Sequence, residues 1–266
     1  MRRAIVTLVV TLIAVAASAQ NMITRGPVPQ LLIPAAGALQ GGNGTFFRSD
    51  ISLINYRGAD QRVRLQWLPQ DVTGVGLAPT DITINAASGI ASEDFVTTVM
   101  GRSGLGAILV TGIDAGGNSD PSALLVATSR IWTTEPGSSG TQSQSLPSIA
   151  TTDIVSGTVS ILGARRETRY RVNTGIVNLS ASTQTFQVAL LGSFGTEVHQ
   201  SAPVPAMSMT LFGVTGQSST IPLQINVVNI GAPPRSSLWV AYASSVDNVT
   251  GDAWTTLGFN SGPPPP

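Results

Sequence analysis

The amino-acid sequence predicts an all-β protein made of two tandem Ig-like antiparallel β-sandwiches with a short helical turn. Gly (28 residues) and Pro (17 residues) interrupt the chain at short intervals, and the runs between them are rich in Val, Ile, Leu and Thr. This pattern is typical of short strands joined by turns. No long stretch shows helical periodicity. In addition, the first half of the chain is similar to the second half at a constant spacing.

The internal similarity is clearest between residues 45–69 and 168–192, which align without a gap. Both begin with a strand-like alternation, TFFRSDISLIN and TRYRVNTGIVN, which places successive side chains on opposite faces. Each predicted strand ends in Asn, and a short polar turn and another strand follow. Shared polarity, turn position and spacing indicate a duplicated unit. The residues of the first copy that recur identically are Thr45, Arg48, Asn55, Gln61 and Leu68.

Other predicted strands extend the match, and each copy then has six or seven strands, within the size of a sandwich domain. A single barrel spanning both copies is the structural alternative. The further strand pairs are 31–37 with 159–164, 104–112 with 222–230, and 123–132 with 237–246. The expected organisation is a signal peptide at 1–19, repeat 1 at 27–150, repeat 2 at 155–260 and a Pro-rich tail at 261–266 that cannot join a sheet.

One segment, SEDFVTTVMG at 92–101, breaks the β pattern. Ser92 is a plausible N-cap, and Glu93 and Asp94 in the first turn suit the helix dipole. Phe95 and Met100 are among the apolar residues expected to face inward. We therefore predict a helix of one or two turns that bridges the sheets.

The N-terminus predicts export. A positive start, Met1-Arg2-Arg3, precedes an uncharged, mostly apolar run and the small residues Ala17-Ser18-Ala19, which is the pattern of a secretory signal peptide. A membrane anchor is the alternative, but the run is shorter than the roughly 20 residues of a spanning helix. We expect a secreted or periplasmic protein with no membrane span after cleavage. The chain has no cysteine, so disulfides and thiolate metal sites are excluded.

The charge pattern argues against nucleic acid as a partner. The chain carries 14 basic residues, all of them Arg, and 14 acidic residues, whereas a nucleic-acid binder normally shows a basic excess. The arginines of RRETRYR, at 165–171, form a candidate patch for an anionic ligand, but Glu167 partly offsets it and a solvated hairpin is favoured.

Catalytic and metal-binding patterns are weak. His199 is the only histidine, in a segment expected to be turn-like, so neither a His-based metal cluster nor a typical Ser-His-Asp triad is supported. The acidic loops at 114–120 and 247–252 do not fit the EF-hand calcium pattern, and hairpin turns are favoured over calcium sites. Most other aspartates are placed at turns, which argues against a glycosidase pair. We expect no enzymatic activity, no metal and no cofactor.

Five residues remain as candidates for binding: Arg48, Asp50, Arg171, Trp132 and Trp254. Arg48 and Asp50 share a strand face, and Arg171 occupies the position of Arg48 in the second copy. A structural brace is the favoured interpretation of these charges. Trp132 and Trp254 lie at predicted strand ends, where an exposed indole suits a glycan, although the sequence does not fix their orientation.

Several motifs resemble a tandem repeat of exported proteins from environmental bacteria. The order is Pro34-Ala35-Ala36, then GGNGTFFRSDISLIN, then VRLQWLP, and the close of the second copy, AYASSVDNVTGD, is also similar. The second copy departs from the pattern, with Asn173 in place of the repeat's Asp. The resemblance covers nearly all of the chain after residue 19 and implies a β-sandwich located outside the cell, with no catalytic residue.

The sequence thus predicts a secreted, non-catalytic structural or adhesive protein that binds a surface protein or a glycan. Edge strands that accept a partner strand are a further route to binding. The alternative is a carbohydrate-active enzyme or a glycan-binding subunit. The sequence leaves the ligand and the oligomeric state open.

Overall fold

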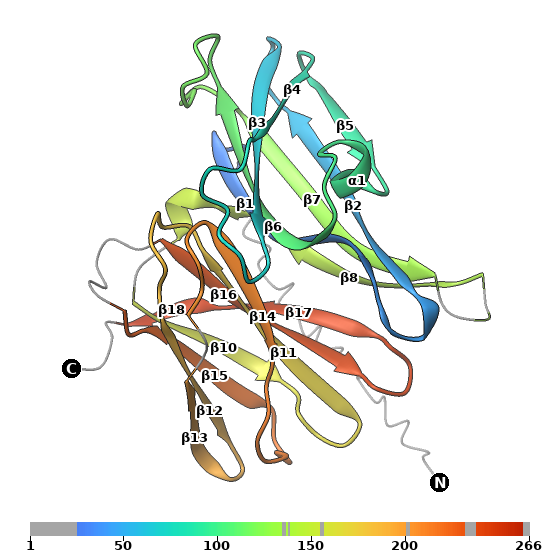
Figure 1. Cartoon of the computed structure of the whole chain (residues 1–266), viewed down its shortest axis with the longest axis vertical. Helices are drawn as coiled ribbons and strands as arrows, with labels where there is room; N and C mark the ends of the chain where they lie inside the picture. Colours follow the sequence, from blue (N-terminus) through green and yellow to red (C-terminus); the bar gives the residue numbers. More distant parts are fainter. Residues whose placement is uncertain are drawn as a thin grey trace, which may run out of the picture.

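The computed structural model describes residues 26–134, 137, 139–154, 157–200, 203–231 and 238–262, and within these ranges the side chains of Asn43, His199 and Gln200 are not described. The predicted signal peptide and residues 263–266 of the predicted tail lie outside the described residues. The chain forms antiparallel sheets almost throughout, so the predicted all-β class is confirmed (Figure 1). The finer Ig-like assignment stays a prediction.

The N-terminal half of the described chain contains strands β1 to β9. Two short 3-10 helices, η1 (Gly42–Gly44) and η2 (Thr151–Asp153), and one α-helical turn, α1 (Phe95–Thr98), lie among them. The strands are β1 (Gln30–Gln40), β2 (Phe46–Asn55), β3 (Gln61–Pro69), β4 (Thr80–Ile84), β5 (Ser88–Ser92), β6 (Gly104–Ile113), β7 (Leu125–Thr134), β8 (Thr141–Pro147) and β9 (Ile149–Ala150).

The C-terminal half contains strands β10 to β18. They are β10 (Thr158–Ala164), β11 (Tyr170–Asn178), β12 (Phe186–Gly192), β13 (Gly195–Gln200), β14 (Ser208–Gly213), β15 (Leu223–Asn229), β16 (Trp239–Asp247), β17 (Ala253–Leu257) and β18 (Phe259–Gly262). His199 was expected in a turn, and this is wrong. It lies in β13, where its backbone pairs with Val188.

Strand order is the same in both halves. In the N-terminal half the pairings run β4-β3-β6-β1-β9 and β5-β2-β7-β8, and in the C-terminal half they run β13-β12-β15-β10-β18 and β14-β11-β16-β17. Each strand of the N-terminal half therefore corresponds to the strand whose number is nine higher, from β1 and β10 to β9 and β18. One difference is that the end of β1 pairs with the start of β2 and joins the two N-terminal sheets. The sheets of the two halves share no ladder among the described residues; an isolated bridge joins Gln70 to Met209.

Alternating side chains of each half build its own core. Residues such as Ile51, Leu53 and Leu125 face inward in the N-terminal half, and Phe186 packs on Trp239 in the C-terminal half with ring centroids 4.9 Å apart. The predicted helical turn is confirmed, and Phe95 and Met100 join the first core. Its predicted start is wrong: Asp94 is the N-cap, because Ser92 is still the last residue of β5.

The predicted tail also begins later than expected. Ser261 and Gly262 belong to β18, which pairs with β10, and the backbone of Gly262 lies opposite Thr158. Pro begins only at residue 263, so the ring that removes a backbone donor does not affect these two positions.

A third apolar cluster lies between the two halves. The outer face of β1, β3 and β6, with residues from β8 and β9, packs on the outer face of the sheet β14-β11-β16-β17 (Figure 1). The fully buried members include Leu32, Leu68, Val177 and Met209. Tyr242 is also buried there, and burial raises the pKa of its hydroxyl far above the ordinary value.

Hydrogen bonds flank this apolar contact on both sides. On one side the loop after β3 reaches β14: the backbone N–H of Asp71 donates to the Met209 carbonyl at 2.9 Å, and that of Gly74 donates to the Ala206 carbonyl at 3.1 Å. On the other side Gln144 of β8 donates to Thr255 Oγ1 at 2.7 Å and accepts from Ser244 Oγ at 2.9 Å. The two halves are thus joined by apolar packing and by direct polar contacts.

Candidate functional site

The outer face of β2, β7 and β8 gathers three of the five predicted binding residues. The strand register places Trp132 beside Arg48 and Ser143, and it places Arg130 beside Asp50 and Ser145. We call this surface the Trp132 face. Its members are Arg48, Asp50, Ser52, Thr128, Arg130, Trp132, Ser143 and Ser145.

Trp132 is half-buried and fixed by its neighbours. Its indole N–H donates to the carbonyl of Glu93 at 2.9 Å, in the segment that leads into α1. The Arg48 guanidinium carbon lies 5.7 Å from the centroid of the Trp132 ring and 4.7 Å from that of Phe46. These distances are typical of cation–π contacts. The indole and the guanidinium therefore form one cluster across two strands.

The charged side chains of the Trp132 face have ion-pair partners on other segments. Arg130 Nη2 donates to Asp50 Oδ2 at 3.0 Å. Arg48 Nε lies 3.8 Å from Asp94 Oδ2, which is too long for a hydrogen bond. Arg48 and Asp50 share a face as predicted, but each has its ion-pair partner on another segment. The partners were not identified from the sequence, because the register between distant strands is not visible there.

The other two predicted residues lie in the C-terminal half and do not form a comparable face. Arg171 is exposed, and its Nη1 donates to Asn248 Oδ1 at 2.6 Å. Trp254 meets Tyr170 edge to face, with ring centroids 5.8 Å apart. The structure therefore separates the two tryptophans: Trp132 lies on an outer sheet face, and Trp254 packs against another aromatic ring.

The arginine-rich segment between β10 and β11 is used for internal contacts. Arg165 and Arg169 place their guanidinium carbons 4.8 Å and 5.5 Å from the Tyr170 ring centroid. Arg165 also pairs with Glu167 at 2.8 Å, and Arg169 Nε donates to Asp247 Oδ2 at 2.8 Å. The Arg169 guanidinium and the N–H of Val249 hold the pKa of Asp247 below its usual value. This pairing favours a braced hairpin over an anion site.

The asparagines that end β2 and β11 make the same set of contacts. Asn55 Nδ2 donates to the carbonyls of Ala59, Ile84 and Asn85, and Asn178 Nδ2 donates to those of Ser182, Val204 and Pro205. Each Oδ1 accepts the backbone N–H two residues later. Both side chains are completely buried. The repeated Asn is thus a structural brace that closes the turn into the next strand.

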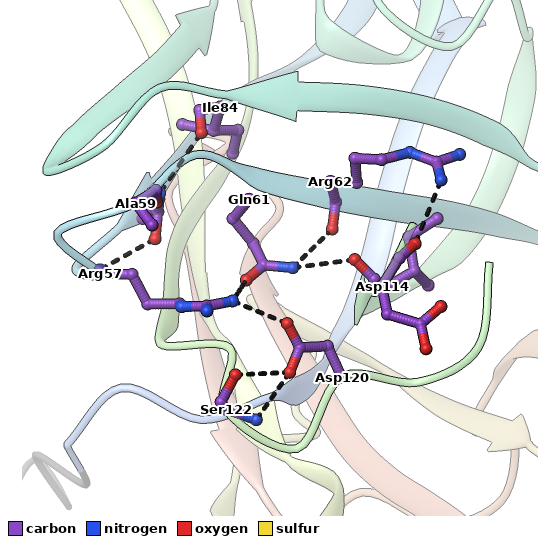
Figure 2. A network of polar contacts seen from close by, with 10 residues as sticks. Arg57, Ala59, Gln61, Arg62, Ile84, Asp114, Asp120 and Ser122 are labelled. Atoms are coloured by element: carbon purple, nitrogen blue, oxygen red, sulfur yellow. Dashed lines mark hydrogen bonds and ion pairs between the residues drawn. The ribbon is translucent and has the colours of Figure 1, made fainter. Parts of the chain in front are cut away.

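A polar network extends this brace in the N-terminal half (Figure 2). Arg57 Nη1 donates to Gln61 Oε1 and to Asp120 Oδ2, both at 2.6 Å, while Asp120 Oδ1 accepts from the hydroxyl and the N–H of Ser122. The Ser122 bonds and Arg57 hold the pKa of Asp120 below its usual value. The sequence did not indicate this role of Arg57 and Gln61, because Asp120 and the carbonyl of Ile113, which they bond, lie more than 50 residues further along the chain.

Carboxylates of the two acidic loops accept hydrogen bonds from the backbone of their own turns. In the loop between β6 and β7, Asp114 Oδ1 accepts the N–H of Asn118 at 2.9 Å, and Asp120 is held as described above. In the loop after β16, Asp247 Oδ1 accepts the N–H of Val249 at 2.8 Å. Within the described residues, no group of three or more His, Cys, Asp or Glu side chains is arranged to hold a metal ion.

Comparison with models of known protein families found no match to this chain, and comparison with curated proteins found none either. Among the described residues, no helix is long and apolar enough to cross a bilayer.

Proposed function

We propose that this protein is a secreted or periplasmic, non-catalytic module that serves a structural or adhesive role and binds proteins or glycans. The observation that carries the proposal is the contact between the halves. Fully buried side chains such as Leu32 and Val177 lie between them, flanked by hydrogen bonds on both sides. Such a contact resists relative motion, which suits a part that bears load or presents a surface.

The pairing of the charged side chains also supports a non-catalytic role. Catalytic acids and bases need carboxyls with access to a substrate. Here Asp50, Asp120 and Asp247 each accept from an arginine, and Asp81 lies 2.8 Å from Arg64 Nη2. The arrangement favours a braced scaffold over an acid–base pair.

Export rests on the sequence. The positive start, the apolar run and Ala17-Ser18-Ala19 have the order of a cleaved signal, and the resemblance to exported tandem repeats agrees with it. The repeated strand order supports two β-sandwich repeats near 27–150 and 155–260 as the units of the module.

The test is a binding assay of the purified chain against isolated cell envelopes and a glycan array. We expect saturable binding to envelopes and no turnover of the glycans. Release of reducing sugar ends from a bound glycan would instead establish the enzyme alternative. Failure to bind envelopes and every glycan on the array would remove the adhesive role.

A further inference from the structure

The Trp132 face differs from an ordinary solvated sheet face. Its centre holds an indole and two guanidinium groups, whereas several neighbouring outward side chains are short and carry hydroxyl groups. These short residues are Ser52, Thr128, Ser143 and Ser145.

We propose that the Trp132 face binds an uncharged polysaccharide chain, with the Trp132 indole as a stacking surface and Arg48, Asp50 and Arg130 as hydrogen-bonding groups. The inference rests on the proposed function and specifies its ligand class and its site.

Trp132 presents an indole that is already held in place. A pyranose ring has an apolar C–H face and a rim of hydroxyls, so it packs on an aromatic ring while its hydroxyls bond beside it. The bond of 2.9 Å from Trp132 Nε1 to the Glu93 carbonyl orients the ring before a ligand arrives. Orientation in advance reduces the entropy that binding would otherwise cost.

Polar groups lie beside the Trp132 ring. The side chains of Arg48 and Arg130 are 37% and 40% exposed, and that of Asp50 is 29% exposed. Arg48 reaches its nearest described carboxylate only at 3.8 Å, so its guanidinium N–H groups stay available as donors. Asp50 supplies an acceptor. Together these side chains offer the directional bonds that sugar hydroxyls require.

The positive and negative charges of the Trp132 face are balanced. The two cations of the face are matched by two carboxylates, in the pairs Arg48–Asp94 and Arg130–Asp50. An anionic polymer would gain little from a locally neutral surface and would face both carboxylates. The face therefore favours a neutral chain.

The counterpart in the C-terminal half indicates a single site per chain. The register places Val246 at the position equivalent to Trp132 and Ser244 at that of Arg130. The same sheet buries Val177 and Tyr242 against the N-terminal half. That face lacks the indole and is partly covered, so we expect a stoichiometry of one chain segment per protein.

The experiment uses the purified full chain with soluble β-1,3-glucan, hydroxyethyl cellulose, mannan and the anionic polymer alginate in affinity electrophoresis, followed by calorimetry with an oligosaccharide of the retained polymer. We expect retention by at least one neutral polymer and a weakening of tenfold or more on Trp132→Ala. Trp254→Ala is the matched control and should bind like the original chain.

Folding of each variant is checked by its melting temperature, and Trp132→Phe, which keeps an aromatic face, should retain more affinity than Trp132→Ala. Equal affinity of Trp132→Ala and the original chain would overturn the proposed site. Retention by alginate alone would overturn the neutral ligand. Envelope binding without any polysaccharide binding would overturn this inference and leave the proposed adhesive function standing, whereas loss of both would overturn both.

Discussion

The two halves have the same strand order, but they use different sheets in the contact between them. The N-terminal half buries the outer face of its five-stranded sheet, and the C-terminal half buries the outer face of its four-stranded sheet. The four-stranded sheet of the C-terminal half is sealed against its neighbour, and the equivalent sheet of the N-terminal half carries the Trp132 face. The strand registers also show which residues are equivalent in the two sheets. The residues buried in the contact are Val177, Met209, Tyr242 and Leu257, and their equivalents in the N-terminal sheet are, in the same order, Ile54, Gly89, Thr128 and Pro147.

The five-stranded sheets show the reverse difference. Leu32 and Leu109 lie opposite each other in the contact between the halves, and their equivalents in the free sheet are Ser160 and Asn226. Ser160 Oγ donates to Asn226 Oδ1 at 2.7 Å. Each free face thus lacks several of the apolar side chains that the contact uses. Identical topology therefore does not imply identical surfaces: a few outward positions decide which face is buried and which is offered to a partner.

The largest effect on stability should come from replacing an apolar residue of the contact with its equivalent from the free sheet. Tyr242→Thr gives the sealed sheet the residue of the free sheet, and it deletes a ring that packs against Gly175. We expect the free energy of unfolding to fall by about 3 kcal/mol or more, as for other buried aromatic truncations. Chemical denaturation measures the change. Tyr56→Thr is the control, since Tyr56 is 55% exposed; equal effects of the two variants would refute the role of the contact.

The next largest effect concerns the buried asparagine brace that both halves have. Asn55→Ala and Asn178→Ala each remove one amide donor that three carbonyls share, and we expect a loss of about 2 to 4 kcal/mol in both. The losses should agree within about 1 kcal/mol, because the two braces are alike. Thermal or urea unfolding measures them, with the exposed Asn118→Ala as control. A large loss in one half and none in the other would show that the braces are not equivalent.

A smaller effect should follow from adding a side-chain atom to the loop after β3, on the side of the contact where this loop bonds to the segment at β14. A Cβ at Gly74 would meet the Met207 carbonyl oxygen, so Gly74→Ala forces this loop away from β14 and costs about 1 to 3 kcal/mol. Gly58→Ala is the control, because nothing lies within 4 Å of the added carbon. Unchanged stability and unchanged amide exchange at Asp71 in Gly74→Ala would contradict the close approach.

The smallest effect concerns the polar network around Asp120 in the N-terminal half. Asp120 has a pKa below its ordinary value in the folded chain, chiefly because of Ser122 and also because of Arg57. Its contribution to stability is therefore present above pH about 4 and is lost as the pH falls below that value. We expect Asp120→Asn to flatten the fall in melting temperature between pH 4 and pH 2. Ser122→Ala should flatten it in part, and an unchanged slope in both would exclude the network as the cause.

Local patterns predicted much of the fold. Alternation and Gly/Pro spacing indicated the all-β class, the recurring segments indicated the shared order of strands, and SEDFVTTVMG indicated the turn at α1. The count of six or seven strands per copy was too low, because strands such as β5 and β9 are short and carry little periodic signal.

The candidate site was only partly visible. Arg48, Asp50 and Trp132 were identified because strand alternation and position are local properties. Arg130 and Asp94 were missed because they meet these residues through register and through the loop before α1. The contact between the halves was missed for the same reason. The apolar outward residues that form it have the alternation of any strand, and only the tertiary arrangement shows which face they cover.

The central claim is that the apolar contact between the two halves makes them unfold together. Differential scanning calorimetry tests this claim most directly. We expect one cooperative transition for the original chain and two transitions, or a marked broadening, for Tyr242→Thr, because the halves then unfold with less coupling. Two well-separated transitions in the original chain, unchanged by Tyr242→Thr, would contradict it.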